Sequence, residues 1–150
     1  MHTIASFEVD HTTLKEGIYL SRVDHEITTY DLRFVIPNQG RYLSNAAMHT
    51  IEHLFAVHSR NGLYGRHIIY FGPMGCRTGF YLLTKGLNHQ DAINLIKECI
   101  LFIRDYDGKI PGCSAKECGN YLEHNLMEAK HICAAYYEKI KDWKEEKLYY

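Results

Sequence analysis

The stretch SNAAMHTIEHLFAVHSRNG, which runs from Ser44 to Gly62, predicts the first long helix of the chain. Its apolar residues recur with a roughly helical period, and they are Met48, Ile51, Leu54, Phe55 and Val57. Ser44 or Asn45 is suited to cap the beginning of the helix, because a short polar side chain there accepts a hydrogen bond from a free backbone amide. Gly62 is suited to end it as a left-handed residue.

Four segments around this helix are expected to be strands. Before it, GIYLSRVD (Gly17 to Asp24) and TTYDLRFVI (Thr28 to Ile36) are rich in β-branched and aromatic residues, and the turn sequence PNQGR follows. After it, RHIIYF (Arg66 to Phe71) and TGFYLLT (Thr78 to Thr84) flank the glycine-rich loop GPMGCR.

Two further helices are expected in the second half. DAINLIKECILFIRDY (Asp91 to Tyr106) follows Asn88, which resembles a capping partner of Asp91. YLEHNLMEAKHICAAYYEKIKDWKEE (Tyr121 to Glu146) is expected to be one long amphipathic helix, and the aromatic end WKEEKLYY a helix face that docks on the sheet. Strands mixed with three helices, without regular βαβ alternation, predict an α+β fold in which a mostly antiparallel sheet packs against three helices. We expect a single domain over residues 1–150.

Composition excludes several classes of protein. The net charge is −1, and neither sign accumulates in any segment, so the chain lacks the basic footprint of a nucleic-acid-binding protein. No apolar run is long enough to cross a membrane, and the first residues do not form a secretory signal. Five cysteines without a C-x-x-C pair do not predict a disulfide framework, so a reducing, cytoplasmic location is expected.

The motif HTIEH places two histidines four residues apart on the predicted helix. His49 and His53 therefore share one face and can hold one ion through their imidazole nitrogens. Glu52 lies beside the same face, where it can reach a group on the ion without being a ligand. The alternative is an ordinary surface helix, since a chain with ten histidines produces such pairs by chance.

A metal site that leaves room for a substrate needs a third protein ligand. Cys99 and Cys133 fall among apolar residues of predicted helices and are expected to be core thiols. Cys113 and Cys118 share the loop PGCSAKECGN, and Cys118 is the better-placed donor, although spacing alone separates the two poorly.

Cys76 lies in GPMGCRTG, where glycines on both sides let backbone amides and a ligand approach closely. The cationic Arg77 next to it favours the thiolate form that nucleophilic or acid/base chemistry requires. The alternative is a small residue that fills a tight turn.

Five motifs together resemble the LuxS family of S-ribosylhomocysteine lyases. They occur in the family's order and at compatible spacing, and they are IASFEVDH, YDLRFVIPN, HTIEHLFA, GPMGCRTGFYL and ECGNYLEHNL. The chain departs from the family pattern at YFG before the cysteine loop, at Arg77 where glutamine is usual, and in KEGIYLSR. These departures leave open the contacts to the homocysteine end of a substrate.

The resemblance implies one divalent metal per chain, held by His49, His53 and Cys118, with Fe(II) as the expected native ion and Zn(II) or Co(II) able to replace it. It implies that Cys76 and Glu52 are the catalytic acid/base residues.

The resemblance also implies a homodimer. Ser6, His11 and Arg33 match substrate-binding positions that the family takes from the partner chain, so that the active site lies at the dimer interface.

The implied reaction cleaves S-ribosylhomocysteine to homocysteine and 4,5-dihydroxy-2,3-pentanedione, the precursor of autoinducer-2 in quorum sensing and a by-product of the methyl cycle. The thioether at C5 can leave by elimination only when a carbonyl at C3 makes the C4 proton acidic. The carbonyl must therefore migrate from C1 to C2 and then to C3. We expect Cys76 to move protons at C1 and C2, and Glu52 to move them among the oxygens and at C3 and C4.

Two other interpretations compete with this one. A small metallopeptidase of the H-x-x-E-H type would use Glu52 to activate water, but it gives Cys76 no task. A non-enzymatic metal or thiol sensor would close its site with Cys113 as a fourth ligand.

Overall fold

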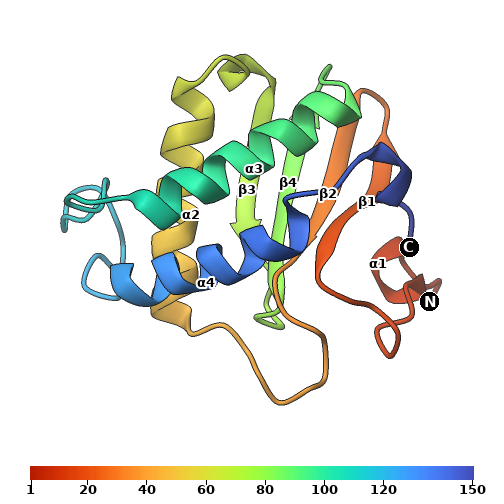
Figure 1. Ribbon diagram of the computed structural model, residues 1–150, viewed down its shortest axis with the longest axis horizontal. Helices are drawn as coiled ribbons and strands as arrows, with labels where there is room; N and C mark the ends of the chain where they lie inside the picture. The colour runs from red at the N-terminus through yellow and green to blue at the C-terminus, as the bar shows by residue number, and fades with distance from the viewer.

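A four-stranded antiparallel sheet with the strand order β1-β2-β4-β3 lies at the centre of the computed structural model, which describes residues 1–150 (Figure 1). The strands are β1 (Gly17–Asp24), β2 (Ile27–Arg33), β3 (Ile68–Pro73) and β4 (Gly79–Lys85). All three pairings are antiparallel, as the sequence predicts.

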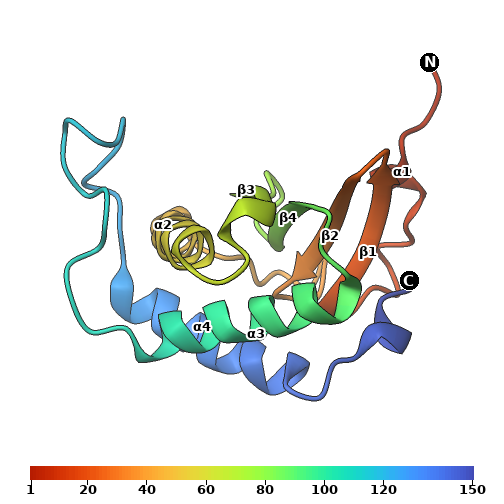
Figure 2. The ribbon, with the colours of Figure 1, turned by 90° about the horizontal axis from the view of Figure 1, so that it is seen from above.

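Three long helices accompany the sheet: α2 (Asn45–Asn61), α3 (His89–Asp105) and α4 (Leu126–Ile140). Helices α3 and α4 cross one face of the sheet side by side, whereas α2 runs along the β3 edge (Figures 1 and 2). The short helix α1 (Ala5–Glu8) lies at the opposite edge, beside β1. The predicted α+β class is therefore confirmed. No helix combines the length and the apolar character that crossing a membrane requires.

One hydrophobic core joins the sheet to the helices. Ile51, Leu54 and Phe55 of α2 are fully buried, and the Phe55 ring stacks on Phe71 with 3.8 Å between centroids. Because these residues recur at the helical period, their burial fixes which side of α2 faces outward and carries the polar residues.

The beginning of α2 agrees with the prediction, but the conformation of Gly62 at its end does not. The Ser44 side chain accepts a hydrogen bond from the Ala47 amide, as expected of a capping residue. Gly62 has φ −86° and is extended, so the predicted left-handed end is wrong. Val57, the last apolar residue of the predicted period, is 43% exposed and does not share the buried face.

The predicted boundaries of β1 are correct, and Asn88 caps α3 by accepting from the Asp91 amide. β2 ends at Arg33, three residues before the predicted Ile36. β3 begins later than predicted because a 3-10 turn, η1 (Gly65–His67), precedes it. Helix α1 was not predicted.

The predicted long final helix is wrong at both ends. Asn125 caps α4, and its amide donates 3.0 Å to the Thr50 hydroxyl of α2, which holds the preceding residues away from helical geometry. After α4 the chain turns and forms only the 3-10 helix η2 (Glu145–Lys147). The aromatic end does dock on the sheet, but through the fully buried Leu148, whose carbonyl accepts from the Leu20 amide at 2.7 Å, and not through a helix face.

The face of the sheet away from α3 and α4 carries polar residues. Tyr19, Asp31 and Tyr81 are register partners on β1, β2 and β4, and they alternate along their strands with core residues such as Tyr30 and Leu82. This face therefore presents ionisable groups next to the cysteine loop.

Candidate active site

Three potential metal ligands converge on the outer side of α2. His49 and His53 project from successive turns, and Cys118 arrives from the loop that precedes α4. One ligand atom from each of the three lies within 4.8 Å of the others. The Cys118 sulfur is 3.3 Å from Nε2 of His49.

Backbone carbonyls fix the tautomers of both histidines. Nδ1 of His49 lies 2.8 Å from the Glu123 carbonyl oxygen, and Nδ1 of His53 lies 2.8 Å from that of Pro111. Because a carbonyl oxygen only accepts, each Nδ1 carries the proton and each Nε2 keeps a free lone pair. Two imidazole nitrogens and one sulfur form a donor set that suits Fe(II), Co(II) or Zn(II). The residues present therefore fit such an ion.

The other cysteines are engaged elsewhere. The Cys113 thiol donates to the Tyr121 carbonyl at 3.2 Å, so it is not a fourth member of the group. Cys99 and Cys133 are fully buried, and this burial raises the pKa of both thiols. The preference for Cys118 over Cys113 thus agrees with the geometry, and the two core thiols lie where the sequence places them.

His124 is a member of this cluster that the sequence did not indicate. Its ring stacks on that of His49 with centroids 4.0 Å apart, and its Nδ1 lies 3.0 Å from the Thr50 hydroxyl. Burial, and then the neighbouring imidazoles of His49 and His53, lower the pKa of His124 to about 4. His124 is therefore uncharged near neutral pH and packs against His49 without repelling a cation.

Glu52 borders a cavity of about 250 Å³ beside these ligands. The lining residues are Asn45, Met48, His49, Glu52, Pro73, Asn120 and Glu123. Pro73 ends β3, immediately before the cysteine loop. The carboxylate, one ligand histidine and the beginning of the cysteine loop thus meet around one space.

The loop between β3 and β4 presents Cys76 as an exposed thiol. The Leu43 amide donates to the Arg77 carbonyl at 2.9 Å, which ties this loop to the segment just before α2. Arg77 takes the left-handed conformation, with φ 60°, and its guanidinium stands over the Tyr42 ring. The structure thus turns the Arg77 charge towards Tyr42.

Arg33 is the cation that lies next to the thiol. Its Nη1 is 4.0 Å from the Cys76 sulfur and donates to the Thr78 hydroxyl at 2.7 Å, and that hydroxyl is 3.1 Å from the sulfur. Because the Thr78 oxygen accepts from Arg33, its own proton is available to the sulfur. This arrangement stabilises negative charge on Cys76.

Asp31 holds Arg33 through two hydrogen bonds, at 3.1 Å from Nε and 2.6 Å from Nη2. Burial alone lowers the pKa of Arg33, but the charge of Asp31 and its hydrogen bonds outweigh burial and raise the pKa above its ordinary value. Arg33 is therefore a permanent cation of the site.

Ser6 and His11 do not approach the metal-ligand group within one chain. They lie in the N-terminal segment, which packs at the β1 edge, whereas α2 lies at the β3 edge (Figure 1). His11 Nδ1 is 2.8 Å from the Val9 carbonyl oxygen, and Ser6 borders a separate cavity of about 320 Å³. Arg33 lies beside Cys76 of the same chain, with Nη1 at 4.0 Å from the sulfur.

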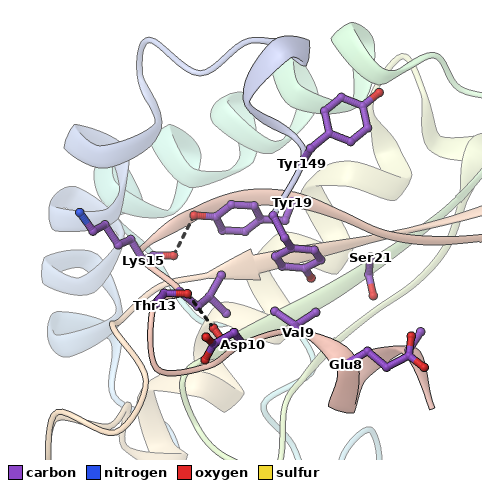
Figure 3. Close-up of a pocket in the computed structure, with 11 residues that line it drawn as sticks. Glu8, Val9, Asp10, Thr13, Lys15, Tyr19, Ser21 and Tyr149 are labelled. Carbon is purple, nitrogen blue, oxygen red and sulfur yellow. Dashed lines mark hydrogen bonds between the residues drawn. The ribbon is translucent and has the colours of Figure 1, made fainter. Parts of the chain in front are cut away.

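The largest cavity, of about 720 Å³, lies between the N-terminal segment and the end of the chain (Figure 3). Asp10, Lys15, Tyr19 and Ser21 are among the residues around it. It contains none of the predicted metal or acid/base residues, so size alone does not identify the reactive site.

Comparison with known proteins agrees with these motifs. The family model of S-ribosylhomocysteinase (LuxS) matches residues 4–147. An S-ribosylhomocysteine lyase of Finegoldia magna is 47% identical over 155 aligned positions, which cover 100% of this chain and 99% of that protein. Proteins of the same name from Clostridium acetobutylicum and Phocaeicola vulgatus are 44% and 45% identical, over 100% of this chain and 99% and 98% of theirs.

The match covers the strands, the helices and the loops that carry the histidine and cysteine residues described above. The chain belongs to the S-ribosylhomocysteinase (LuxS) family.

Proposed function

We propose that this protein is an S-ribosylhomocysteine lyase, which converts S-ribosylhomocysteine to homocysteine and 4,5-dihydroxy-2,3-pentanedione. The observation that carries this proposal is the convergence of His49, His53 and Cys118, whose ligand atoms lie within 4.8 Å of one another. Membership of the family supports the substrate, since relatives that align over the whole chain are named S-ribosylhomocysteine lyase.

His49, His53 and Cys118 would hold one divalent ion, Fe(II) in the native protein, with Zn(II) or Co(II) able to replace it. When bound, the ion supplies Lewis-acid stabilisation of the negative charge that develops on the sugar oxygens. The backbone bonds to the two Nδ1 atoms would leave both Nε2 lone pairs available to the ion.

Cys76 would act as the base at C1 and C2 of the sugar. Each carbonyl migration removes a proton next to a carbonyl and returns one to the neighbouring carbon, so a single thiolate can perform both transfers. Arg33 and Thr78, at 4.0 Å and 3.1 Å from the sulfur, stabilise the charged form that this role needs.

Glu52 would move protons among the sugar oxygens and at C3 and C4. It borders the cavity next to His49, so its carboxylate can reach a sugar held beside the ligands. Removal of the C4 proton then expels homocysteine from C5 by β-elimination. The resulting enol takes up a proton at C5 and loses its hydroxyl proton, which gives 4,5-dihydroxy-2,3-pentanedione.

Ser6 and His11 would complete the substrate site from a partner chain of a homodimer. This assignment is supported by their distance from α2 across the sheet within one chain (Figures 1 and 2). A cytoplasmic location, and a product used for signalling or methyl-cycle recycling, belong to the same proposal.

An anaerobic assay on S-ribosylhomocysteine with free-thiol detection tests this function. Cys76→Ala and Glu52→Gln are each expected to abolish homocysteine release while the metal content stays at the wild-type level. Near-full turnover by either variant would remove that residue from its role. No thiol release by the metal-loaded wild-type protein would refute the proposed reaction.

A further inference from the structure

The last ten residues are held in place by contacts with β1 and with α3. Leu148 is fully buried, and its carbonyl accepts from the Leu20 amide of β1 at 2.7 Å. The Trp143 carbonyl accepts from the Lys97 ammonium of α3 at 2.8 Å. These contacts bring the side chain of Tyr150 to the face of the sheet that carries Asp31.

The Tyr150 hydroxyl donates to Oδ2 of Asp31 at 2.7 Å. Its ring stacks on Tyr19, with centroids 4.9 Å apart and planes 13° from parallel. Tyr19 and Ser21 border the cavity of Figure 3, and Tyr150 lines the same cavity. Burial, and then the Asp31 carboxylate, raise the pKa of Tyr150, so the phenol keeps its proton and remains a donor.

Oδ2 of Asp31 receives two donors, because Nη2 of Arg33 also binds it at 2.6 Å. The remaining Arg33 nitrogen, Nη1, points the other way, towards Thr78 and the Cys76 sulfur. A continuous line of polar contacts thus runs from Tyr150 through Asp31 and Arg33 to the thiol.

The planar guanidinium couples the orientation of Asp31 to the position of Nη1 of Arg33. Two hydrogen bonds to one carboxylate fix the plane of the Arg33 fork, and the direction of Nη1 follows from that plane. Asp31 and Arg33 are each 2% exposed, so protein groups supply the hydrogen bonds of this pair. Without the phenol, Oδ2 keeps Nη2 of Arg33 as its one donor, so the carboxylate is free to turn about that bond. The plane of the Arg33 fork turns with it, and Nη1 then moves relative to the sulfur.

We propose that Tyr150 is a positioning residue that sets the placement of the Arg33 cation beside Cys76 through the carboxylate of Asp31. The catalytic meaning of this placement rests on the proposed function, but the effect on the thiol does not. Besides Arg33 of β2, the ionisable groups near the sulfur are Tyr81 of β4 and the adjacent Arg77, which stands over the Tyr42 ring. Arg33 is therefore the cation through which Tyr150 acts.

The test uses Tyr150→Phe, which keeps the ring on Tyr19 and removes only the hydroxyl. Tyr149→Phe is the matched control, because Tyr149 is the adjacent residue and is 67% exposed. Tyr19→Phe is a second control, since it removes a hydroxyl from the same stack, one that donates to the Lys15 carbonyl and not to Asp31. Circular dichroism and thermal unfolding verify that all three variants are folded at the assay temperature.

The readout is the rate at which iodoacetamide alkylates Cys76 as a function of pH, followed by mass spectrometry of the peptide that contains it. We expect this rate to be about threefold slower near neutral pH in Tyr150→Phe, because a displaced Arg33 stabilises the reacting thiolate less. Both controls are expected to retain the wild-type profile. A wild-type profile in Tyr150→Phe, or an equal displacement in a control, would overturn the proposal.

Turnover separates this inference from the proposed function. In an active enzyme, Tyr150→Phe is expected to lower kcat about threefold, with KM and metal content unchanged. A displaced alkylation profile in a protein that releases no homocysteine would uphold the positioning role and refute the lyase assignment. Normal turnover by wild type together with an unaltered alkylation profile in Tyr150→Phe would uphold the lyase assignment and refute the positioning role.

Discussion

The carboxylate of Asp31 and the guanidinium of Arg33 form a two-point ion pair in which each side chain is only 2% exposed. The pair connects two regions of the molecule, because Asp31 also binds Tyr150 and Arg33 also binds Thr78. A buried cation of this kind is tolerated only while its counter-charge is present.

Asp31→Asn is therefore expected to destabilise the protein strongly. Removing one partner leaves the Arg33 charge buried and uncompensated, which costs about 3–5 kcal/mol in the free energy of unfolding. Urea denaturation measures this change. Asp24→Asn is the control, because Asp24 pairs with Arg22 at the surface, where the two side chains are 51% and 57% exposed. This variant should leave the midpoint of denaturation almost unchanged. Equal midpoints for the two variants would contradict the importance of the buried pair.

Gly112→Ala is expected to weaken metal binding about tenfold, the lower end of the range for a disturbed partner of a ligand. Gly112 has φ +69°, and a Cβ there would lie 3.2 Å from Nδ1 of His53, the atom that donates to Pro111. Competition with a chelator measures the affinity. Gly40→Ala supplies the control, because Gly40 has φ +73° with nothing within 4 Å of the added atom. Equal losses in both variants would attribute the effect to backbone strain alone.

Thr50→Val is expected to lower the free energy of unfolding by about 0.5–1.5 kcal/mol, because the hydrogen bond that joins α2 to the beginning of α4 is lost. The Thr50 hydroxyl accepts from the Asn125 amide at 3.0 Å, and it also lies 3.0 Å from Nδ1 of His124. Thr50→Ser keeps the hydroxyl and should stay much closer to wild type in the same denaturation experiment. If the serine variant were as unstable as the valine variant, the methyl group and not the hydrogen bond would be responsible.

Tyr30 makes stability depend on pH at the alkaline end. Burial, and then the charge of Glu145, raise the pKa of Tyr30 from 10.0 to about 12 in the folded protein. Below pH 10 the phenol is protonated in both states, so its contribution is fully present. Between about pH 10 and 12 only the unfolded state loses the proton, and stability falls by up to about 1.4 kcal/mol per pH unit. Tyr30→Phe should lack this component when unfolding is compared at pH 9 and pH 11, and a parallel decline in both proteins would count against it.

Local signals account for the parts of the fold that the sequence predicts well. Ser44 caps α2 and Asn88 caps α3, each by accepting a hydrogen bond from the amide three residues ahead. The beginning of both helices therefore depends on a few adjacent residues. The spacing of His49 and His53 is equally local, because one helical turn brings them together.

Long-range contacts account for what the sequence does not predict. The start of α4 depends on Thr50, which is 75 positions from Asn125, and Tyr150 meets Asp31 across 119 positions. The stack of His124 on His49 likewise needs the folded loop. Spacing separated Cys113 from Cys118 poorly for the same reason, since only the path of that loop decides which sulfur reaches the histidines.

The visible absorption spectrum of the Co(II)-loaded protein tests the proposed metal centre most directly, since a thiolate ligand produces an intense charge-transfer band. We predict that Cys118→Ser abolishes this band, whereas Cys113→Ser retains it at wild-type intensity with one Co(II) per chain. A band that survives in Cys118→Ser, or that disappears in Cys113→Ser, would contradict the assignment of His49, His53 and Cys118 as the metal ligands.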